Sequence, residues 1–182
     1  MTSTATGEAE ILALIGKIVL QWNYAEHCSR QILRPHLTTG GSIHDADQIK
    51  LSKQNAKFVE DQLRIVVLPK WVGSPGEAWL GDLIAAFNSA REHRNYYVHG
   101  VYATHQPDPS QPAQASMFPK IQGVAQLPKF ITAKDLWPIA KHVEELGMVA
   151  NTVGNAFDRD GNGTAPTLQK LTPLPPIISA PV

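Results

Sequence analysis

Four stretches of the sequence repeat apolar side chains at intervals of three and four residues, and this period constrains the fold most. Such spacing places the apolar residues on one face of an α-helix. The stretches cover 8–33, 47–68, 77–99 and a last one that runs to 157. Pro35, Pro69 and Gly100 follow the first three, and each is a residue type that ends helices. The pattern predicts an all-α protein, a four-helix bundle in which the apolar faces pack together.

The same spacing predicts the core residues of each helix. In the second helix they are Ile49, Ala56, Val59, Leu63 and Val66, and in the fourth they are Leu136, Ile139, Val143, Leu146, Ala150 and Val153. The start of the fourth helix has two solutions. Thr132 and Asp135 have the spacing of a capping box, whereas Pro138 fits the first turn better if Asp135 is the cap.

The helical period is lost between the third and fourth helices and again after residue 157. Two β-favouring pieces, 101–104 and 116–118, flank a proline-rich sequence, so we expect an inserted β-hairpin or irregular loop there. Residues 158–182 are rich in Asp and Gly and then in Pro, which predicts a disordered C-terminal tail. The expected organisation is a flexible N-terminus at 1–7, one domain at 8–157 and the tail at 158–182.

Composition excludes several classes of protein. The 182 residues include 16 Lys+Arg and 16 Asp+Glu, so the chain is not generally basic, and we expect no DNA ligand. The single Cys28 excludes an internal disulfide framework and a Cys-rich zinc site. The N-terminal residues lack the pattern of a signal peptide, and the apolar run 11–20 is too short to cross a bilayer. We therefore expect a cytoplasmic protein with no membrane partner.

The most informative string lies late in the third predicted helix and reads Ala90-Arg-Glu-His-Arg-Asn-Tyr-Tyr-Val-His-Gly100. Within it, Arg94-Asn95-x-x-x-His99 resembles the signature of the HEPN superfamily, which has an Arg, a polar neighbour and a His a few positions on. The place of the string in the third of four predicted helices is similar as well. The glycine and the aromatic-rich strand-like piece that follow the His add to the likeness. As architecture, the resemblance covers roughly residues 8–157.

The resemblance implies metal-independent RNA cleavage, in which the ribose 2′-hydroxyl attacks the neighbouring phosphate and leaves a cyclic phosphate end. Active members pair two such motifs across a dimer interface. The expectation is therefore an endoribonuclease with an RNA substrate, a homodimer, and a role in a toxin–antitoxin or defence system with an antitoxin or other protein partner. Other members have lost catalysis, so a silent RNA-binding or protein-interaction module is the alternative.

The chemistry of the three motif residues agrees with that use. Arg94 stays charged and presents a planar fork that matches phosphate oxygens. His99 can exchange a proton with a 2′-hydroxyl or a leaving oxygen near neutral pH. Asn95 lies one turn before His99 and would orient the imidazole ring by a hydrogen bond. We therefore expect Arg94, His99 and Asn95 to be the catalytic residues.

The helical positions of Arg94 and His99 set a geometric condition. Arg94 falls on the expected apolar stripe of its helix, between Ala90 and Val98. Five residues of α-helix rotate by about 140°, so Arg94 and His99 do not share a face. Either a second subunit completes the site, or the long Arg94 side chain reaches round to His99. The expectation of a homodimer also follows from this condition.

A carboxylate near the first apolar stripe is a candidate for a supporting role. Glu26 lies on or beside that stripe, and a buried carboxylate needs a cation. The expected partner is Arg94 or Arg91. A purely structural interpretation stays open, in which the arginine only pairs with this carboxylate and His99 only caps carbonyl groups.

Three tyrosines surround His99 in the sequence. Tyr97 and Tyr102, together with Tyr96, would stack on RNA bases in a nuclease. Aromatic residues at a helix end serve equally well as core or dimer contacts. Both interpretations are therefore kept for these residues.

We expect no metal and no other cofactor. Residues 158–163 match the first half of an EF-hand loop, but Gln169 stands where the bidentate Glu is needed, so a flexible linker is the better interpretation. The clusters Glu26-His27-Cys28 and Glu92-His93 consist of adjacent residues, which diverge by about 100° on a helix and do not chelate by themselves.

Basic residues also recur along the second predicted helix, at Lys50, Lys53, Lys57 and Arg64. Such a row could follow an RNA backbone. Glu60 and Asp61 interrupt it, however, so a solvated helix face is the better interpretation.

Overall fold

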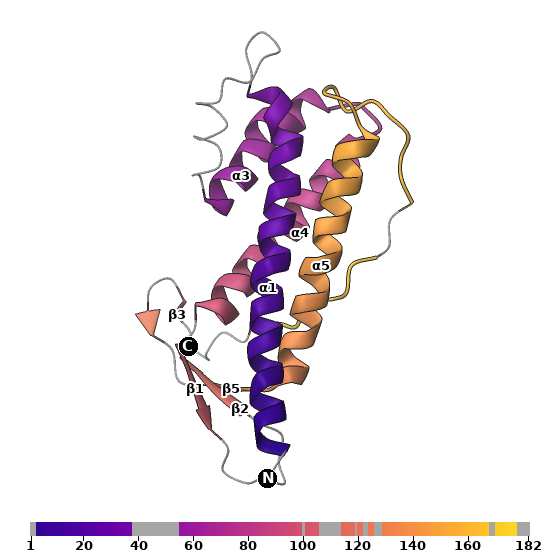
Figure 1. Cartoon of the computed structure of the whole chain (residues 1–182). Helices are drawn as coiled ribbons and strands as arrows, with labels where there is room; N and C mark the ends of the chain where they lie inside the picture. The colour runs from indigo at the N-terminus through magenta and orange to yellow at the C-terminus, as the bar shows by residue number, and fades with distance from the viewer. Residues whose placement is uncertain are drawn as a thin grey trace. The chain divides into compact units, whose positions relative to one another are not determined.

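The computed structural model of the chain describes residues 3–37, 55–99, 101–105, 114–118, 120–121, 124–125, 129–167 and 170–177 (Figure 1). Helix is the main secondary structure of these residues, as the apolar spacing predicts. The long helices are α1 (Ser3–Leu33), α4 (Glu77–Val98) and α5 (Ala133–Ala156). None of the helices in the described part of the chain is long and apolar enough to span a membrane.

The first helix starts earlier than the periodicity predicts. α1 begins at Ser3 rather than at 8, within the stretch 1–7 whose flexibility stays a prediction. Its end at Leu33 agrees with the sequence, because Pro35 cannot continue the α-helix. A single 3₁₀ turn, η1 (Arg34–His36), follows and accommodates this proline within its first turn.

The second predicted helix differs most from expectation. It does not run unbroken from 47 to 68, because Asn55 has extended dihedral angles and its side chain accepts a hydrogen bond from the Phe58 N–H. This is the arrangement of an N-cap, and α3 (Ala56–Gln62) begins directly after it. A π-helical turn, η2 (Leu63–Val67), and a 3₁₀ turn, η3 (Leu68–Lys70), complete the segment. The expected core residue Ile49 lies outside the described residues.

The π-helical turn changes which residues are buried. The fully or almost fully buried apolar residues are Val59, Leu63, Val67 and Trp71, at intervals of four. A π-helix closes hydrogen bonds between residues five apart, as between the Leu68 N–H and the Leu63 carbonyl. Its wider turn moves the buried position from the predicted Val66, which is half-buried, to Val67.

In the fourth helix the expected stripe is confirmed, and one of the two predicted starting points is selected. α5 begins at Ala133 with Thr132 before it, so the alternative with Asp135 as the cap is wrong. The Asp135 carboxylate accepts hydrogen bonds from both the backbone N–H and the hydroxyl of Thr132, each at 2.8 Å. Pro138 lies inside the helix. The predicted core residues Leu136, Ile139, Val143, Leu146, Ala150 and Val153 are all fully buried.

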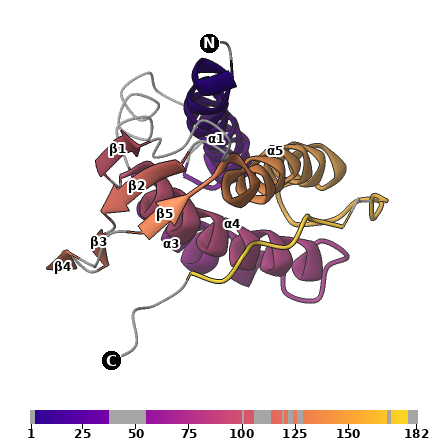
Figure 2. The ribbon, with the colours of Figure 1, turned by 90° about the horizontal axis from the view of Figure 1, so that it is seen from below.

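Short strands lie between α4 and α5. β1 (Val101–His105), β2 (Gln114–Phe118) and β5 (Lys129–Ile131) form an antiparallel sheet in the order β1-β2-β5, and Figure 2 shows β2 between the other two. A second antiparallel pair consists of β3 (Lys120–Ile121) and β4 (Val124–Ala125). The segment after the candidate motif is therefore paired backbone.

The chain forms two compact units, and each draws on parts of α1, α4 and α5. The first consists of Met1–Trp22, Ala90–Glu144 and Leu171–Val182, and the second of Asn23–Ser89 and Glu145–Lys170. In the first unit the Lys17 ammonium pairs with the Glu144 carboxylate at 3.0 Å, which joins α1 to α5. In the second unit a Cβ added at Gly147 would lie 2.6 Å from a ring carbon of Tyr24, so glycine permits close packing of α5 on α1.

Residues 158–177 differ from the expected disordered tail wherever they are described. The Trp71 indole N–H donates to the Arg159 carbonyl at 3.1 Å, and the Asp158 carboxylate accepts hydrogen bonds from the Asp160 and Asn162 N–H groups, both at 2.9 Å. Gly161 has a φ of 78°, which favours glycine. Short-range turn chemistry thus gives this Asp/Gly segment a definite conformation.

Candidate catalytic site on α4

The buried face of α4 bends away from Arg94 near the end of the helix. Ala90, His93 and Tyr97 are buried there, whereas Arg94 and Val98 are only half-buried. Arg94, which falls on the expected apolar stripe, is therefore not fully buried in the core. Because His93 and Tyr97 continue the buried stripe, Arg94 lies at its edge and can turn towards the surface.

Arg94 reaches the other two motif residues within one chain. Its Nη1 lies 2.6 Å from Nε2 of His99 and 3.1 Å from Oδ1 of Asn95. Of the two arrangements that the sequence allows, the structure has the one in which the Arg94 side chain bridges the helical rotation. The three candidate catalytic residues therefore form one cluster at the C-terminal end of α4, in the first unit.

The hydrogen-bonding capacity of arginine fixes the direction of both contacts. A guanidinium group only donates, so Nε2 of His99 accepts and the ring proton lies on Nδ1. The Asn95 side-chain oxygen accepts from the same nitrogen of Arg94. Asn95 thus orients the arginine, and the predicted hydrogen bond from Asn95 to the imidazole is replaced by this one.

The exposure of the cluster suits a site that receives an anion. His99 and Asn95 are exposed and Arg94 is half-buried. Nε of Arg94 is buried and has no hydrogen-bond partner among the described residues. The contacts to His99 and Asn95 are made by the terminal nitrogen Nη1. A phosphate oxygen would compete with His99 for the Arg94 N–H and leave Nε2 of His99 free to take a proton.

The supporting carboxylate pairs with a different arginine. Glu26 forms an ion pair with Arg30, one turn further along α1, and both residues belong to the second unit. This i,i+4 arrangement satisfies the half-buried carboxylate locally. Arg94, one of the two expected partners, contacts His99 and Asn95 instead. The expected role of Arg91 as partner of Glu26 stays a prediction.

The tyrosines next to the motif are core residues. Tyr96 and Tyr97 are 6% and 3% exposed, and their rings meet edge to face at a centroid distance of 4.9 Å. Burial raises the pKa of Tyr97 to about 12, so its hydroxyl is a poor proton donor at neutral pH. Packing in the core, rather than stacking on RNA bases, therefore fits Tyr96 and Tyr97. Tyr102 lies in β1 opposite Met117, and its side chain is outside the described parts.

The sequence interpretation did not predict that two histidines of the first unit are buried. His93 in α4 and His142 in α5 are 9% and 6% exposed. Nε2 of His93 lies 2.6 Å from the Pro175 carbonyl, and Nδ1 of His142 lies 2.6 Å from the Thr172 carbonyl. Their burial could have been predicted from their spacing, because His93 lies three residues after the buried Ala90 and His142 three residues after the buried Ile139.

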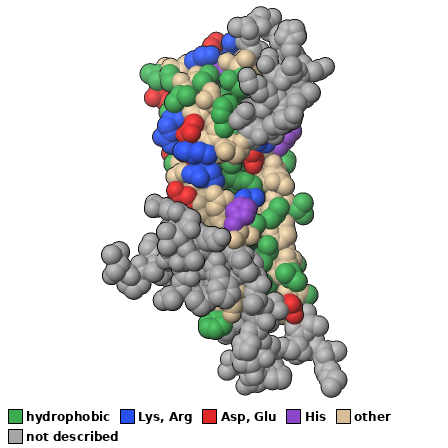
Figure 3. Space-filling view, turned by 90° about the vertical axis from the view of Figure 1, so that its left-hand side faces the viewer, with side chains coloured by type: hydrophobic (Ala, Val, Ile, Leu, Met, Phe, Trp, Pro, Cys, Tyr) green, Lys and Arg blue, Asp and Glu red, His purple; other side chains and the backbone are tan. Residues whose placement is uncertain are grey.

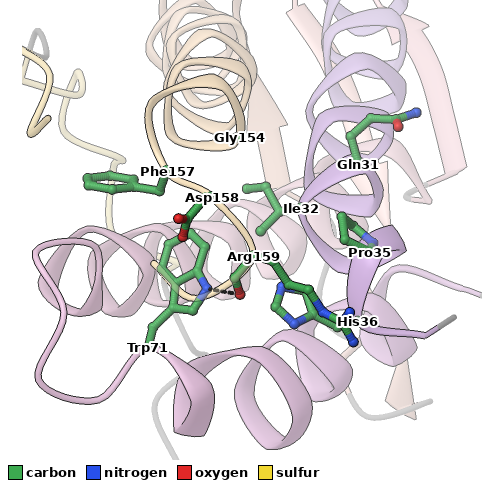
Figure 4. A pocket seen from close by; sticks show the side chains of 9 residues that line it. All are labelled: Gln31, Ile32, Pro35, His36, Trp71, Gly154, Phe157, Asp158 and Arg159. Carbon is green, nitrogen blue, oxygen red and sulfur yellow. Dashed lines mark hydrogen bonds between the residues drawn. The ribbon is translucent and has the colours of Figure 1, made fainter. Parts of the chain in front are cut away.

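The second unit contains a pocket of about 210 Å³, whose lining side chains are drawn in Figure 4. His36, Trp71 and Phe157 are among them, and the ring centroids of Trp71 and Phe157 are 5.6 Å apart. Burial lowers the pKa of His36 to about 4, and the nearby charges of Lys70 and Arg159 add to this effect. His36 is therefore neutral at physiological pH, and we assign this pocket to the packing of the unit.

Several charged groups away from this cluster pair with one another. On the face shown in Figure 3, Lys and Arg side chains are interspersed with Asp and Glu side chains. On α3, Lys57 pairs with Asp61 at 2.9 Å and with Glu60 at 3.3 Å, and Arg64 approaches Glu60 at 3.7 Å. These ion pairs support a solvated face on α3 rather than a row of free cations. Lys50 and Lys53 lie outside the described residues, which contain no group of three potential metal-binding side chains.

Comparisons with protein-family models, curated proteins and solved structures find no match to this chain.

Proposed function

We propose that the chain is a metal-independent endoribonuclease whose site is the cluster of Arg94, Asn95 and His99. The observation that carries the proposal is the 2.6 Å contact between Nη1 of Arg94 and Nε2 of His99 at the exposed end of α4. It joins a phosphate-binding group to a group that transfers protons near neutral pH. The resemblance of the motif to HEPN ribonucleases agrees with this pairing.

The reaction begins when a phosphate of RNA replaces His99 as the acceptor of the Arg94 N–H. Arg94 then holds a non-bridging oxygen, and Asn95 keeps the guanidinium in place. The freed Nε2 of His99 removes the proton from the ribose 2′-hydroxyl as O2′ bonds to phosphorus. The bond from phosphorus to O5′ breaks, and O5′ takes a proton from a second, protonated His99 of a homodimer. The products are a 2′,3′-cyclic phosphate and a 5′-hydroxyl.

Cleavage of mixed RNA in the presence of EDTA tests this proposal. We expect the wild-type chain to leave cyclic phosphate ends, and the Arg94→Ala/His99→Ala variant to be inactive while keeping the helical content of the wild type. The matched control is Arg64→Ala/His27→Ala, which removes the same two residue types at exposed positions. Equal cleavage by the wild type and both variants would assign the activity to another source.

The second candidate is a catalytically silent module that binds RNA. The closed Arg94–His99 contact favours it, because in this arrangement Nε2 of His99 is occupied. Two results together would favour the module. The wild-type protein would bind RNA without cleaving it, and the Arg94→Ala variant would no longer bind RNA.

A further inference from the structure

The segment Leu171–Ile177, with the sequence Leu-Thr-Pro-Leu-Pro-Pro-Ile, is restricted to extended backbone by its own residues. Pro173, Pro175 and Pro176 each fix φ near the polyproline II value. Thr172 and Leu174 precede prolines and are displaced from the α region for steric reasons. The sequence therefore favours a polyproline II helix, which has three residues per turn and no internal hydrogen bonds.

The exposure of the segment has the same period of three. Lys170, Pro173 and Pro176 are exposed, and the residues between them are half-buried. A strand would alternate with a period of two. One edge of the polyproline II helix thus faces solvent, and the other two edges face the protein.

His93 and His142 contact the half-buried side of this segment. His93 and His142 lie opposite the carbonyl groups of Pro175 and Thr172, both at 2.6 Å, and all four residues belong to the first unit. A carbonyl only accepts, so each histidine donates an N–H, His93 from Nε2 and His142 from Nδ1. These carbonyls are three residues apart, which places them on the same side of a polyproline II helix. Figure 2 shows the yellow segment passing beside α4.

We propose that the face of α4 and α5 that carries His93 and His142 is a binding site for a proline-rich segment in the polyproline II conformation. Its resident ligand is Leu171–Ile177 of the same chain. Polyproline II backbone leaves its carbonyls unsatisfied, and histidines that are nine-tenths buried supply fixed donors at the spacing of one turn. Prolines lower the entropic cost of binding, because the free segment already has the bound conformation. This inference does not depend on the proposed nuclease activity.

The experiment measures binding of a fluorescent synthetic peptide, residues 170–177, to full-length protein by anisotropy. In the wild type, the resident segment competes within the chain. In the full-length variant Pro173→Gly/Pro175→Gly/Pro176→Gly the resident segment loses its preformed conformation. We expect the peptide to bind this variant at least tenfold more tightly than the wild type. Pro166→Gly, a proline before the segment, is the matched control and should behave as wild type.

Substitutions of the two histidines test the donors in the same glycine background. Gln places an amide N–H near the position of Nε2, and Asn near that of Nδ1. We therefore expect His93→Gln/His142→Asn to keep peptide binding within threefold and His93→Leu/His142→Leu to weaken it at least tenfold.

A change in the peptide avoids any effect on folding. The labelled peptide with glycine at its three proline positions should bind the glycine-substituted chain at least tenfold more weakly than the native peptide. Equal binding of the two peptides would overturn the inference. It would also be overturned if the native peptide bound the wild-type and glycine-substituted chains equally.

Discussion

His36 is a neutral imidazole inside the second unit, and its titration makes a testable contribution to stability. Its pKa is lowered from 6.5 to about 4, chiefly by burial. The unfolded chain therefore binds more protons than the folded chain between these values, and stability rises with pH there. The full contribution is present above pH 6.5 and is lost as the pH falls towards 4.

We predict that His36→Gln reduces the acid sensitivity of folding. A shift of this size corresponds to a loss on the order of 3 kcal/mol between pH 7 and pH 4 in the wild type, which the variant should lack. Urea unfolding at pH 7 and pH 4.5 measures the difference. His27→Gln, at an exposed position, serves as control and should keep the wild-type pH dependence. If His36→Gln keeps the wild-type dependence as well, His36 is not a buried neutral group.

The sequence supplied the residues of the candidate site but not the contacts between their side chains. Arg94, Asn95 and His99 were found from residue types and spacing. The direction of Arg94 was not, because it depends on where the buried stripe of α4 turns at His93 and Tyr97. His93 also hydrogen-bonds a carbonyl 82 residues away, and helical periodicity contains no information on such a partner.

Among the elements, η2 gives the sharpest test of backbone geometry. Val67 is fully buried and its neighbour Val66 is half-buried, whereas the apolar spacing predicts Val66 as the core residue. We expect Val67→Ala to lower the free energy of unfolding by about 1–3 kcal/mol, as for the removal of two buried methyl groups, and Val66→Ala to cost clearly less. Chemical denaturation of both variants measures this, and the opposite ranking would contradict the burial of Val67.

The start of α5 is stabilised by two hydrogen bonds that Thr132 donates to the Asp135 carboxylate. Thr132→Ala removes one of the two hydrogen bonds to the carboxylate and should cost about 0.5–2 kcal/mol. If the cap acts as a unit, the double variant with Asp135→Ala should lose less than the sum of the two single variants. Thermal and urea unfolding of the four chains measure this, and full additivity would show that the residues act independently.

Elements with a strong apolar period were the most predictable. The entire predicted stripe of α5 is buried, and α1 ends where Pro35 requires. The segment from 56 to 70 was less predictable, since Asn55 acts as a cap and η2 widens the helix. Periodicity assumes a constant number of residues per turn, so it fails where that number changes.

For the whole molecule, composition was a poor guide to the end of the chain. A proline-rich segment lacks the apolar residues for a core of its own, which led to the prediction of disorder. Thr172 and Pro175 nevertheless supply carbonyls to buried histidines, and residues 171–177 belong to the first unit. Such a segment becomes ordered by the donors that another part of the chain provides, and these are not visible in its own sequence.

We propose above that the Arg94–Asn95–His99 cluster cleaves RNA through the ribose 2′-hydroxyl. The most direct measurement is the single-turnover rate on a DNA oligonucleotide that contains one ribonucleotide, with EDTA present. We expect cleavage only at that ribonucleotide, a rate about 10²–10⁴-fold lower for His99→Ala, and no cleavage when the 2′-hydroxyl is methylated. Cleavage of the methylated oligonucleotide, or an unchanged rate in a folded His99→Ala variant, would contradict it.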